Sequence, residues 1–442
     1  MSAPTLQQAI DKAGSAMNLL WKPGSGLPTV PKVPAEFDGW REEQRAWEET
    51  VALLDLCHHM DDLFVEGPDA TKLLQYSSAN NFDNFAVGQA KQFVCVNEQG
   101  YLVQDGILMR FAEDSYNLIG IGGAANWVKY HAQAGSYDVK LTYDPASNVR
   151  QTAPVLFRYQ VQGPNAAAML ADLFGDQLED IKFFHFRQVE LGGHRFYALR
   201  HGMTGQAGYE FSGDWEHEEF LRNALIEAGK KHGLVQVGGR AYYTTGVDSG
   251  WMATPVAAIY TGDALRDYRE FISLYSYEGM SPIHGSYYSP NIEDYYRSPY
   301  ELGYGRSISF KHDFFGRDGL MKRKDDLRRK KVTLIWNQDD VVRVFGVDHG
   351  LIHSYTKDRV ESGTGLVGVS EYASFIDPAG EVHSLAVVDN AFAAPGTELT
   401  LVWGEHPGAD APADVLDGMA RIRVTVQPAP YNEHARTTYR TD

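Results

Sequence analysis

The glycine cluster in "YNLIGIGGAANWVKY" is the first candidate for chemistry in this 442-residue chain. Gly120, Gly122 and Ala125 spell G-x-G-x-x-A after an apolar run, a pattern found in turns that cradle a dinucleotide pyrophosphate. That role needs parallel strands flanking a helix and an acidic residue about 20 positions later, where Asp138 and Asp144 lie. The preceding run "GILMRFAEDS" is instead typical of a hairpin partner, which pairs antiparallel. The sequence therefore argues against a nucleotide cradle.

The adjacent pair His58 and His59 is the second candidate, because imidazole nitrogens are common metal ligands. Neighbouring side chains on a strand point to opposite faces, and no third ligand stands at a matching spacing. Cys57 and Cys95 are the only cysteines, too few for a disulfide framework or a zinc site, and both are expected to be buried. The sequence therefore predicts no metal site.

The charge balance argues against nucleic-acid partners. The chain carries 58 acidic and 40 basic side chains, a formal net charge of -18, and such a field repels polyanions. An anionic ligand would therefore have to meet a local basic cluster. The first residues show no secretory or organelle-targeting pattern, and no apolar run is long enough to span a membrane, so we expect a cytoplasmic protein.

Local patterns predict a mixed α+β protein of about two or three domains. Residues 23–37 are rich in proline and glycine and are expected to form an extended arm, whereas "DGWREEQRAWEETVALLD" fits either an edge strand or a helix. Residues 92–123 contain β-rich runs divided by "EQG", "QDG" and "EDS", typical of an antiparallel meander. After the charge run "KRKDDLRRKK", short strands at regular intervals indicate a small all-β domain. Helices are predicted at "AANWVKYHAQAG", "GPNAAAMLADLFG" and "EHEEFLRNALIEAGKKHGL".

Four segments carry a family resemblance: "RHGMTGQAGYE", "VGGRAYYTTGVDSGW", "SPYELGYGRSISFKHDFFGRDGL" and "FAAPGTELTLVWG". Together they resemble the T protein of the glycine cleavage system, the folate-dependent aminomethyltransferase family. Within it, the chain is most similar to the tetrahydrofolate-dependent vanillate O-demethylases of lignin-degrading bacteria, from its first residues to "ARTTY". The resemblance implies a three-domain cloverleaf around a central folate channel, which we divide at residues 1–150, 151–327 and a C-terminal β-barrel at 328–442.

The resemblance also implies a set of tetrahydrofolate-binding residues. Glu210, at the end of the T-G-x-x-G-x-E turn, matches the glutamate that binds the pterin, and a carboxylate suits the adjacent N–H donors of that ring. Its alternative role is a solvated carboxylate at a strand end. Arg240 matches an arginine near folate, and Lys330 is the best candidate for the glutamate tail, although its charge run also fits a solvated linker. The implied lining of the pterin pocket, each member of which also fits a core position, is Gln160, Phe183, Tyr209 and Trp251.

Two residues are implied to take part in the reaction. Tyr242 matches the tyrosine that donates to the departing phenolic oxygen, and its ordinary pKa of about 10 is close to that of a phenol. The alternative is a buried tyrosine bonded to backbone. Asp105 matches an acid that faces the reacting folate nitrogens, although Asp-Gly is equally a hairpin turn.

The substrate pocket departs from that of the vanillate enzymes. Ile121 replaces the arginine that holds the substrate carboxylate, and Val30 and Leu56 replace polar pocket residues, while His59 and Met60 are expected as walls. Gly122 and Gly123 replace Ala-Pro, and we expect them to enlarge the pocket. A carboxylate facing these apolar side chains would lose about 2 kcal/mol or more by desolvation.

The sequence therefore favours a neutral aryl ether, either a methylenedioxyphenyl lignan such as sesamin or a methoxyphenol. The products would be a catechol or phenol and 5,10-methylene- or 5-methyl-tetrahydrofolate. An aromatic acid such as vanillate or syringate is an alternative, since Arg436 in the tail would be able to hold a carboxylate. Aminomethyl transfer from a lipoylated carrier protein is disfavoured, so no carrier is expected, and a non-enzymatic folate-binding protein is the remaining alternative.

Overall fold

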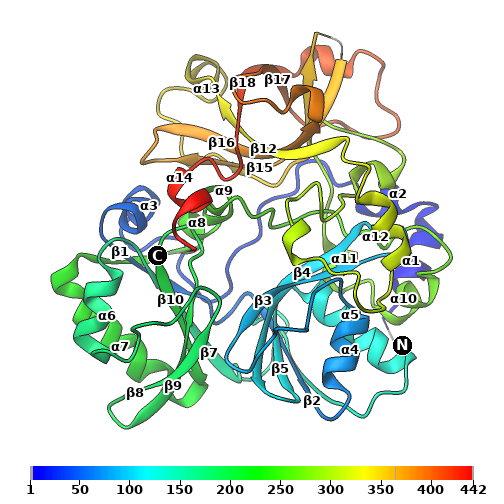
Figure 1. The fold of residues 1–442 in the computed structure, drawn as a ribbon. Helices are drawn as coiled ribbons and strands as arrows, with labels where there is room; N and C mark the ends of the chain where they lie inside the picture. The colour runs from blue at the N-terminus through cyan, green and yellow to red at the C-terminus, as the bar shows by residue number, and fades with distance from the viewer. Residues whose placement is uncertain (1–2, 364, 441–442) are drawn as a thin grey trace.

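The computed structural model of the protein describes residues 3–363 and 365–440. Three β-sheets, each with at least one helix packed on it, surround the centre of the molecule (Figure 1), which confirms the predicted α+β cloverleaf. No helix in the described part of the chain is both long enough and apolar enough to cross a membrane. The first two units exchange segments across residue 150: β1 joins the second sheet, and residues 256–296 pack in the core of the first. The division into three continuous segments therefore stays a prediction.

The first sheet is the predicted antiparallel meander, in the order β3-β4-β5-β2-β6. β5 pairs antiparallel with both β2 and β4, which confirms that the glycine cluster does not open a parallel nucleotide-binding unit. "QDG" does not divide two strands as expected, because Asp105 and Gly106 lie inside β4. A side chain at Gly106 would meet the Ile119 carbonyl at 2.8 Å, so this glycine permits close approach of β5 rather than a turn. The strands are β2 (Asp61–Glu66), β3 (Ala90–Val96), β4 (Leu102–Ala112), β5 (Ser115–Gly120) and β6 (Lys140–Asp144).

The core of the first sheet collects helices from distant parts of the chain. α5 follows β5 directly, as predicted, and packs on β4 and β5. α1 packs against α10, which lies more than 250 positions later in the chain, and α2 packs on α1, so this unit closes only when both regions have folded. The helices are α1 (Leu6–Ala13), α2 (Ala16–Leu20), α4 (Ala70–Tyr76), α5 (Gly122–Ala134), α10 (Arg266–Phe271), α11 (Tyr277–Met280) and α12 (Arg317–Arg323).

The second sheet has the order β11-β1-β7-β10-β9-β8, in which β1 pairs parallel with β11 and antiparallel with β7. α6 and α7 cover one face, and both were predicted. The ambiguous segment before β1 is a helix, α3. The elements are α3 (Trp40–Glu49), β1 (Val51–Asp55), β7 (Leu156–Gln162), α6 (Ala166–Phe174), β8 (Phe186–Leu191), β9 (His194–Arg200), β10 (Gly208–Asp214), α7 (Glu218–Gly229), β11 (Leu234–Val237), α8 (Gly239–Tyr242) and α9 (Thr245–Ser249).

The C-terminal unit is the predicted small β-barrel. Its strands close in the order β15-β14-β17-β18-β12-β16 because β16 pairs back onto β15. The short strand β13 adds to β15, and the tail then leaves the barrel and ends in α14, next to α8 and α9 (Figure 1). The elements are β12 (Arg329–Trp336), α13 (Gln338–Phe345), β13 (His353–Ser354), β14 (Asp358–Ser362), β15 (Gly365–Ile376), β16 (Glu381–Asp389), β17 (Glu398–Trp403), β18 (Ala420–Gln427) and α14 (Glu433–Thr437).

Candidate active site

A polar face of the second sheet is buried in the middle of the molecule. On β7, Arg158, Gln160 and Gln162 alternate with core residues, and Glu210 on β10 stands directly opposite Gln160. Side chains at alternate positions share one face of a strand, and such a polar face normally meets water. Here these four residues are only 0–7% exposed. The intervening side chains form the apolar core beneath α6 and α7, and include Phe157, Tyr159, Val161 and Phe211.

A buried ion triad crosses this face. The Arg158 guanidinium donates to both carboxylate oxygens of Asp62, at 2.8 and 3.1 Å, and its Nε lies 3.1 Å from Glu210 Oε1. Burial raises the pKa of Glu210, and the nearby Arg158 lowers it. Since both carboxylates share one cation, Arg158 fixes the side chain of Glu210 against the sheet.

Tyr242, at the end of α8, meets His59 from the turn between β1 and β2. The Tyr242 hydroxyl lies 2.6 Å from His59 Nε2, and the two rings meet edge to face with centroids 4.6 Å apart. Burial raises the pKa of Tyr242 well above its usual value, and Tyr243, Tyr372 and Glu210 add to the effect. The hydroxyl therefore keeps its proton at neutral pH. It bonds to a side chain rather than to the backbone, unlike in the alternative raised from the sequence.

His59 stays neutral in the folded protein. Burial lowers its pKa to about 3, helped by the positive charge of Arg158, and its Nδ1 has no hydrogen-bond partner among the described residues. His58 points elsewhere, with Nδ1 2.9 Å from Ser147 Oγ. The two histidines diverge from a turn, not from a strand as expected. Among the described residues, no group of three or more His, Cys, Asp or Glu side chains is arranged to hold a metal ion.

The buried state of His59 predicts a pH dependence of stability. The unfolded histidine binds a proton near pH 6.5 and the folded one only near pH 3, so the folded state is increasingly disfavoured as the pH falls below 6.5. Between pH 7 and pH 5, the free energy of unfolding should fall by about 2 kcal/mol more in the wild type than in His59→Gln. Urea unfolding at both pH values measures this difference. Equal losses in the two proteins would contradict a neutral, buried His59.

Asp105 lies in a second buried cluster. Its Oδ2 accepts hydrogen bonds from Trp251 Nε1 at 2.9 Å and from Gln92 Nε2 at 2.8 Å, while Oδ1 has no partner among the described residues. Burial raises its pKa, and the two hydrogen bonds lower it. Lys331 is electrostatically coupled to Asp105, donates to the Gly250 carbonyl at 2.5 Å, and has its pKa lowered by burial to about 8. The structure therefore joins two predicted site residues, Asp105 and Trp251, through one hydrogen bond.

The predicted substrate walls gather around Tyr242. Leu56 and Met60 share an apolar cluster with the Tyr242 ring, and a side chain at Gly239, on the same helix, would touch Val30 of the extended arm. Ile121 directly follows Gly120, which is paired with Asp61, so Ile121 and Met60 leave the same end of two neighbouring strands.

The glycines after Ile121 do not enlarge this pocket. A side chain at Gly122 would lie 2.9 Å from the Asp61 carboxylate, and one at Gly123 would lie 3.4 Å from Gln104. Both glycines are buried, so the space over them is already filled. The expectation of a roomier pocket was wrong, because neighbouring side chains already occupy the space above both glycines.

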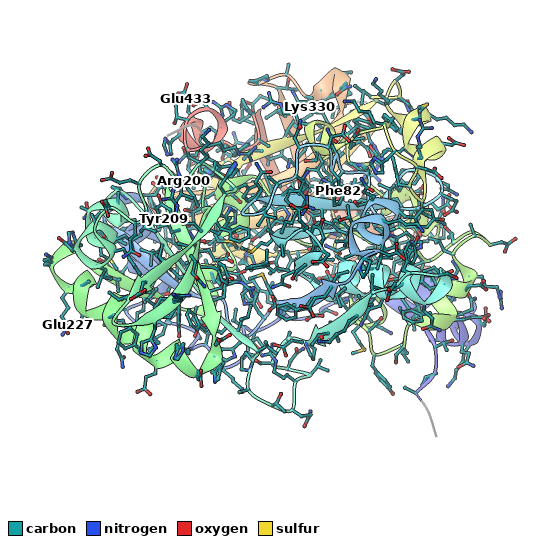
Figure 2. All side chains as sticks on the ribbon, turned by 60° about the horizontal axis from the view of Figure 1, so that its bottom comes forward. Phe82, Arg200, Tyr209, Glu227, Lys330 and Glu433 are labelled. Carbon is teal, nitrogen blue, oxygen red and sulfur yellow. The ribbon has the colours of Figure 1, made fainter. Side chains whose placement is uncertain are left out.

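Several predicted cofactor residues lie apart from this centre. Tyr209 shares the core face of β10 and donates to the Leu178 carbonyl at 3.0 Å, and Figure 2 shows it beside Arg200 on the next strand. Arg240 is 61% exposed and pairs with Glu36 of the arm. Lys330 is exposed on the barrel, while its neighbour Lys331 points inward. Phe183, by contrast, borders the polar face: its ring stacks on Phe184, and its centroid lies 6.4 Å from that of His201, whose carbonyl accepts from Gln160.

Sequence reasoning missed Arg158, Asp62 and Lys331. The strict alternation in "FRYQVQ" carried a signal for Arg158, because it defines a polar face on a strand in the middle of the sheet, where water has no access.

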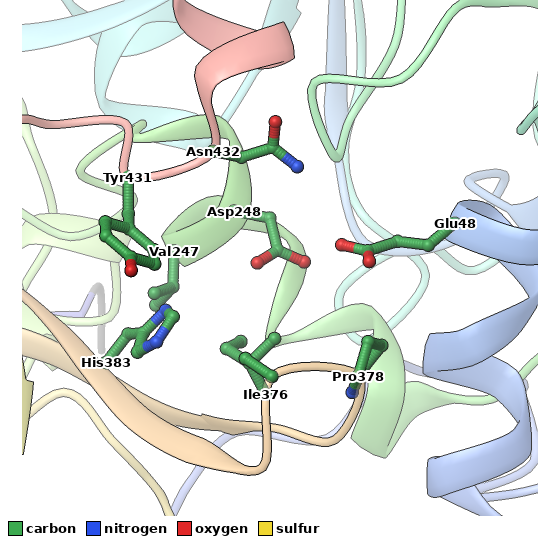
Figure 3. A pocket seen from close by; sticks show the side chains of 9 residues that line it. Glu48, Val247, Asp248, Ile376, Pro378, His383, Tyr431 and Asn432 are labelled. Atoms are coloured by element: carbon green, nitrogen blue, oxygen red, sulfur yellow. The ribbon is translucent and has the colours of Figure 1, made fainter.

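A cavity of about 180 Å³ lies between α3, α9, β16 and the tail (Figure 3). It is lined by Glu48, Asp248 and other residues, and none of the predicted site residues lines it.

The buried polar atoms of this region suit a pterin ring. Gln160 donates to the His201 carbonyl at 2.7 Å, but its Oε1 has no partner among the described residues, as is also true of Asp105 Oδ1. Buried oxygens of this kind are normally hydrogen-bonded. Pterin N–H groups are donors of the type that these oxygens and the Glu210 carboxylate accept, so the residues fit tetrahydrofolate.

Comparison with known proteins agrees with this geometry. A sequence model of the GCVT N-terminal domain matches residues 21–255. The chain is 38% identical to the syringate O-demethylase of Sphingobium sp. (strain NBRC 103272 / SYK-6), over 99% of this chain and 98% of that protein. It is 29% identical to the sesamin methylene transferase of Sinomonas sp. (strain No.22), over 90% of each chain. The fold matches the glycine cleavage system aminomethyltransferase T of Bartonella henselae with a TM-score of 0.65 at 18% identity, over 96% of each chain.

These relationships confirm the predicted family and fold, and they confirm an enzyme of one-carbon transfer that uses tetrahydrofolate. The polar face with Glu210, the Tyr242–His59 pair and the closed C-terminal barrel all lie within the matched length. The chain belongs to the aminomethyltransferase family of the glycine cleavage T protein.

Proposed function

We propose that this enzyme removes a one-carbon group from a neutral aryl ether, with Tyr242 as the donor to the departing phenolic oxygen. The enzyme is a tetrahydrofolate-dependent aryl ether O-demethylase. The observation that carries the assignment is the Tyr242–His59 contact of 2.6 Å, where the Tyr242 ring packs on an apolar cluster and the buried Glu210 raises its pKa. When bound, tetrahydrofolate supplies the nucleophilic nitrogen that accepts the one-carbon group.

Residues of both sheets hold and position the cofactor. Glu210, held by Arg158, and Gln160 accept from the pterin edge, while Asp105, held by Trp251 and Gln92, faces the cofactor from the first sheet. Holding both reactants in one geometry replaces a bimolecular encounter, which is worth several kcal/mol of the barrier.

Tyr242 stabilises the leaving group. Negative charge grows on the phenolic oxygen as the carbon–oxygen bond breaks, and a preorganised hydroxyl donor lowers the energy of that charge. The donor needs its proton directed at the substrate. The Tyr242 proton is free to point at the substrate when His59 carries its own proton on Nε2 and donates it to the Tyr242 oxygen. The unpartnered Nδ1 permits this tautomer. His59 therefore orients the hydroxyl and stays neutral throughout.

The pocket wall favours an uncharged substrate. Val30, Leu56 and Met60 carry no charge, and the buried cation whose charge reaches His59, Arg158, is already shared between two carboxylates. A substrate carboxylate placed here would lose hydration without gaining a cationic partner. Arg436 is directed at its own tail instead, where its Nη1 donates to the carbonyls of Pro430 and Tyr431.

An aromatic acid such as syringate is the second candidate. The 38% identity to a syringate O-demethylase over nearly the whole chain favours it. The sesamin relative, which acts on a neutral lignan, is less similar but shares the same family. The absence of a carrier protein and the cytoplasmic location stay predictions from the sequence.

A panel of ethers separates the two candidates. Guaiacol, sesamin, vanillate and syringate are each incubated anaerobically with the enzyme and tetrahydrofolate, and the phenolic products are measured. We expect kcat/KM to be highest for a neutral ether. In Ile121→Arg, activity on vanillate should rise by about tenfold or more, because a charge-assisted pair is worth about 1.5–3 kcal/mol. Turnover of the acids alone by the wild type would sink the neutral-substrate proposal.

A further inference from the structure

The C-terminal tail, residues 430–440, leaves the barrel and lies over the elements that carry the predicted pterin site. Figure 1 shows its helix α14 beside α8 and α9 and above β10. The chain thus brings its last described residues back to segments that lie about 180 to 260 positions earlier.

Two close contacts fix the tail in this position. A side chain at Gly250, the neighbour of Trp251, would lie 2.9 Å from the backbone of Pro430. A side chain at Gly205, in the turn that leads to Glu210, would lie 2.4 Å from the Ala435 side chain. Ala435 is only 2% exposed, so α14 is packed against that turn rather than loosely attached.

The end of the tail meets Phe183, the aromatic residue implied to line the pterin pocket. Tyr439 is 6% exposed and packs edge to face on the Phe183 ring with centroids 5.3 Å apart. The Arg440 guanidinium lies 5.7 Å from the centroid of Phe183 and 5.6 Å from that of Tyr439. The adjacent residues Tyr439 and Arg440 therefore form one aromatic and cationic edge with the distant Phe183.

Arg440 also adds to a local positive field. Its charge acts on the inward-pointing Lys331, which is itself coupled to Asp105, and on His201. Within the described residues no carboxylate forms an ion pair with Arg440, although the chain carries 18 more acidic than basic side chains. In a protein whose overall field repels anions, an arginine that has no ion-pair partner among the described residues, beside a residue implied to line the cofactor pocket, marks a place where an anionic group is locally favoured.

Arg436 provides a contrast within the same tail. Its guanidinium donates to the carbonyls of Pro430 and Tyr431, at 2.8 and 3.0 Å, so it stabilises the bend of the tail itself. The two arginines are four positions apart and both are exposed, yet only Arg440 faces the Phe183 ring.

We propose that Arg440 recognises the carboxylates at the glutamate end of tetrahydrofolate, at the edge of the cover that the C-terminal tail forms over the pterin site. The inference rests on the proposed function, because it takes the cofactor to lie along Phe183 and Trp251. In this proposal Arg440 binds the glutamate of tetrahydrofolate in place of Lys330, which is exposed on the barrel.

Binding of two ligands tests this role without any turnover. Tetrahydrofolate and tetrahydropteroate, which lacks the glutamate, are titrated anaerobically by calorimetry into the wild type, Arg440→Gln and Arg436→Gln. We expect Arg440→Gln to weaken tetrahydrofolate binding about threefold to fivefold, the scale of an exposed ion pair, and to leave tetrahydropteroate unchanged. The difference should shrink at 0.5 M NaCl, since salt screens exposed charges. Arg436→Gln should bind both ligands like the wild type.

The other outcomes are distinct. Unchanged binding of both ligands by Arg440→Gln would overturn the inference, and an equal loss for both would show that Arg440 acts through packing on Phe183 instead. A wild type that binds neither ligand would contradict the proposed function itself, and the inference with it.

Discussion

Tyr242→Phe is expected to lower kcat about 10²- to 10³-fold while binding tetrahydrofolate normally. The variant keeps the ring and its packing on His59 but loses the hydroxyl that lies 2.6 Å from Nε2. Loss of one preorganised donor to a developing oxyanion has an effect of this size. Phenol release in single-turnover mixing measures the chemical step, and calorimetry measures cofactor binding.

Tyr243→Phe is the matched control. Its ring stacks on His353 with centroids 5.8 Å apart, and its backbone carbonyl accepts from the Tyr372 hydroxyl. Phenylalanine keeps both of these contacts. This variant should retain most of the activity. Full activity in Tyr242→Phe, or an equal loss in both variants, would remove Tyr242 from the proposed role.

Arg158→Met is expected to destabilise the protein by about 3–5 kcal/mol. Arg158 is 2% exposed and is the shared partner of Asp62 and Glu210, so its removal leaves two buried carboxylates facing each other without a cation. Breaking a buried ion pair from one side has a cost of this size. Urea unfolding at pH 7 measures the loss.

Two further variants identify the cause of that loss. Arg158→Met combined with Glu210→Gln should be more stable than Arg158→Met alone, because one buried charge is gone. Arg266→Met, which removes a half-exposed pair with Glu270 at 3.2 Å, should change stability by less than about 1 kcal/mol. A loss below about 1 kcal/mol in Arg158→Met would show that the triad is not desolvated as described.

Local patterns in the sequence predicted most of the elements. The meander of β3, β4 and β5 and the helices α5, α6 and α7 follow from period and turn chemistry, which are local properties. The placement of β1 between β7 and β11 does not, because strand pairing across more than 100 positions leaves no local signal. The same holds for the return of the tail to Gly205 and Phe183.

The site was predicted in part, and for a similar reason. Tyr242, His59 and Glu210 came from motifs, and the structure places them around Arg158. Arg158 itself carries no motif, and its importance comes from the burial of a polar sheet face by the other two units. Tyr209 was assigned to the same pocket as Glu210 although adjacent strand residues face opposite sides. The room expected over Gly122 depended on Asp61, whose position only the fold defines.

The most direct test of the account follows the transferred carbon. An aryl ether labelled with ¹³C in its one-carbon group is mixed anaerobically with the enzyme and a stoichiometric amount of tetrahydrofolate, and ¹³C NMR locates the label after one turnover. The account predicts one equivalent of labelled cofactor for each phenol or catechol released, and no label transfer in Tyr242→Phe on the same timescale. Label released as methanol or formaldehyde, or phenol formed without tetrahydrofolate, would contradict it.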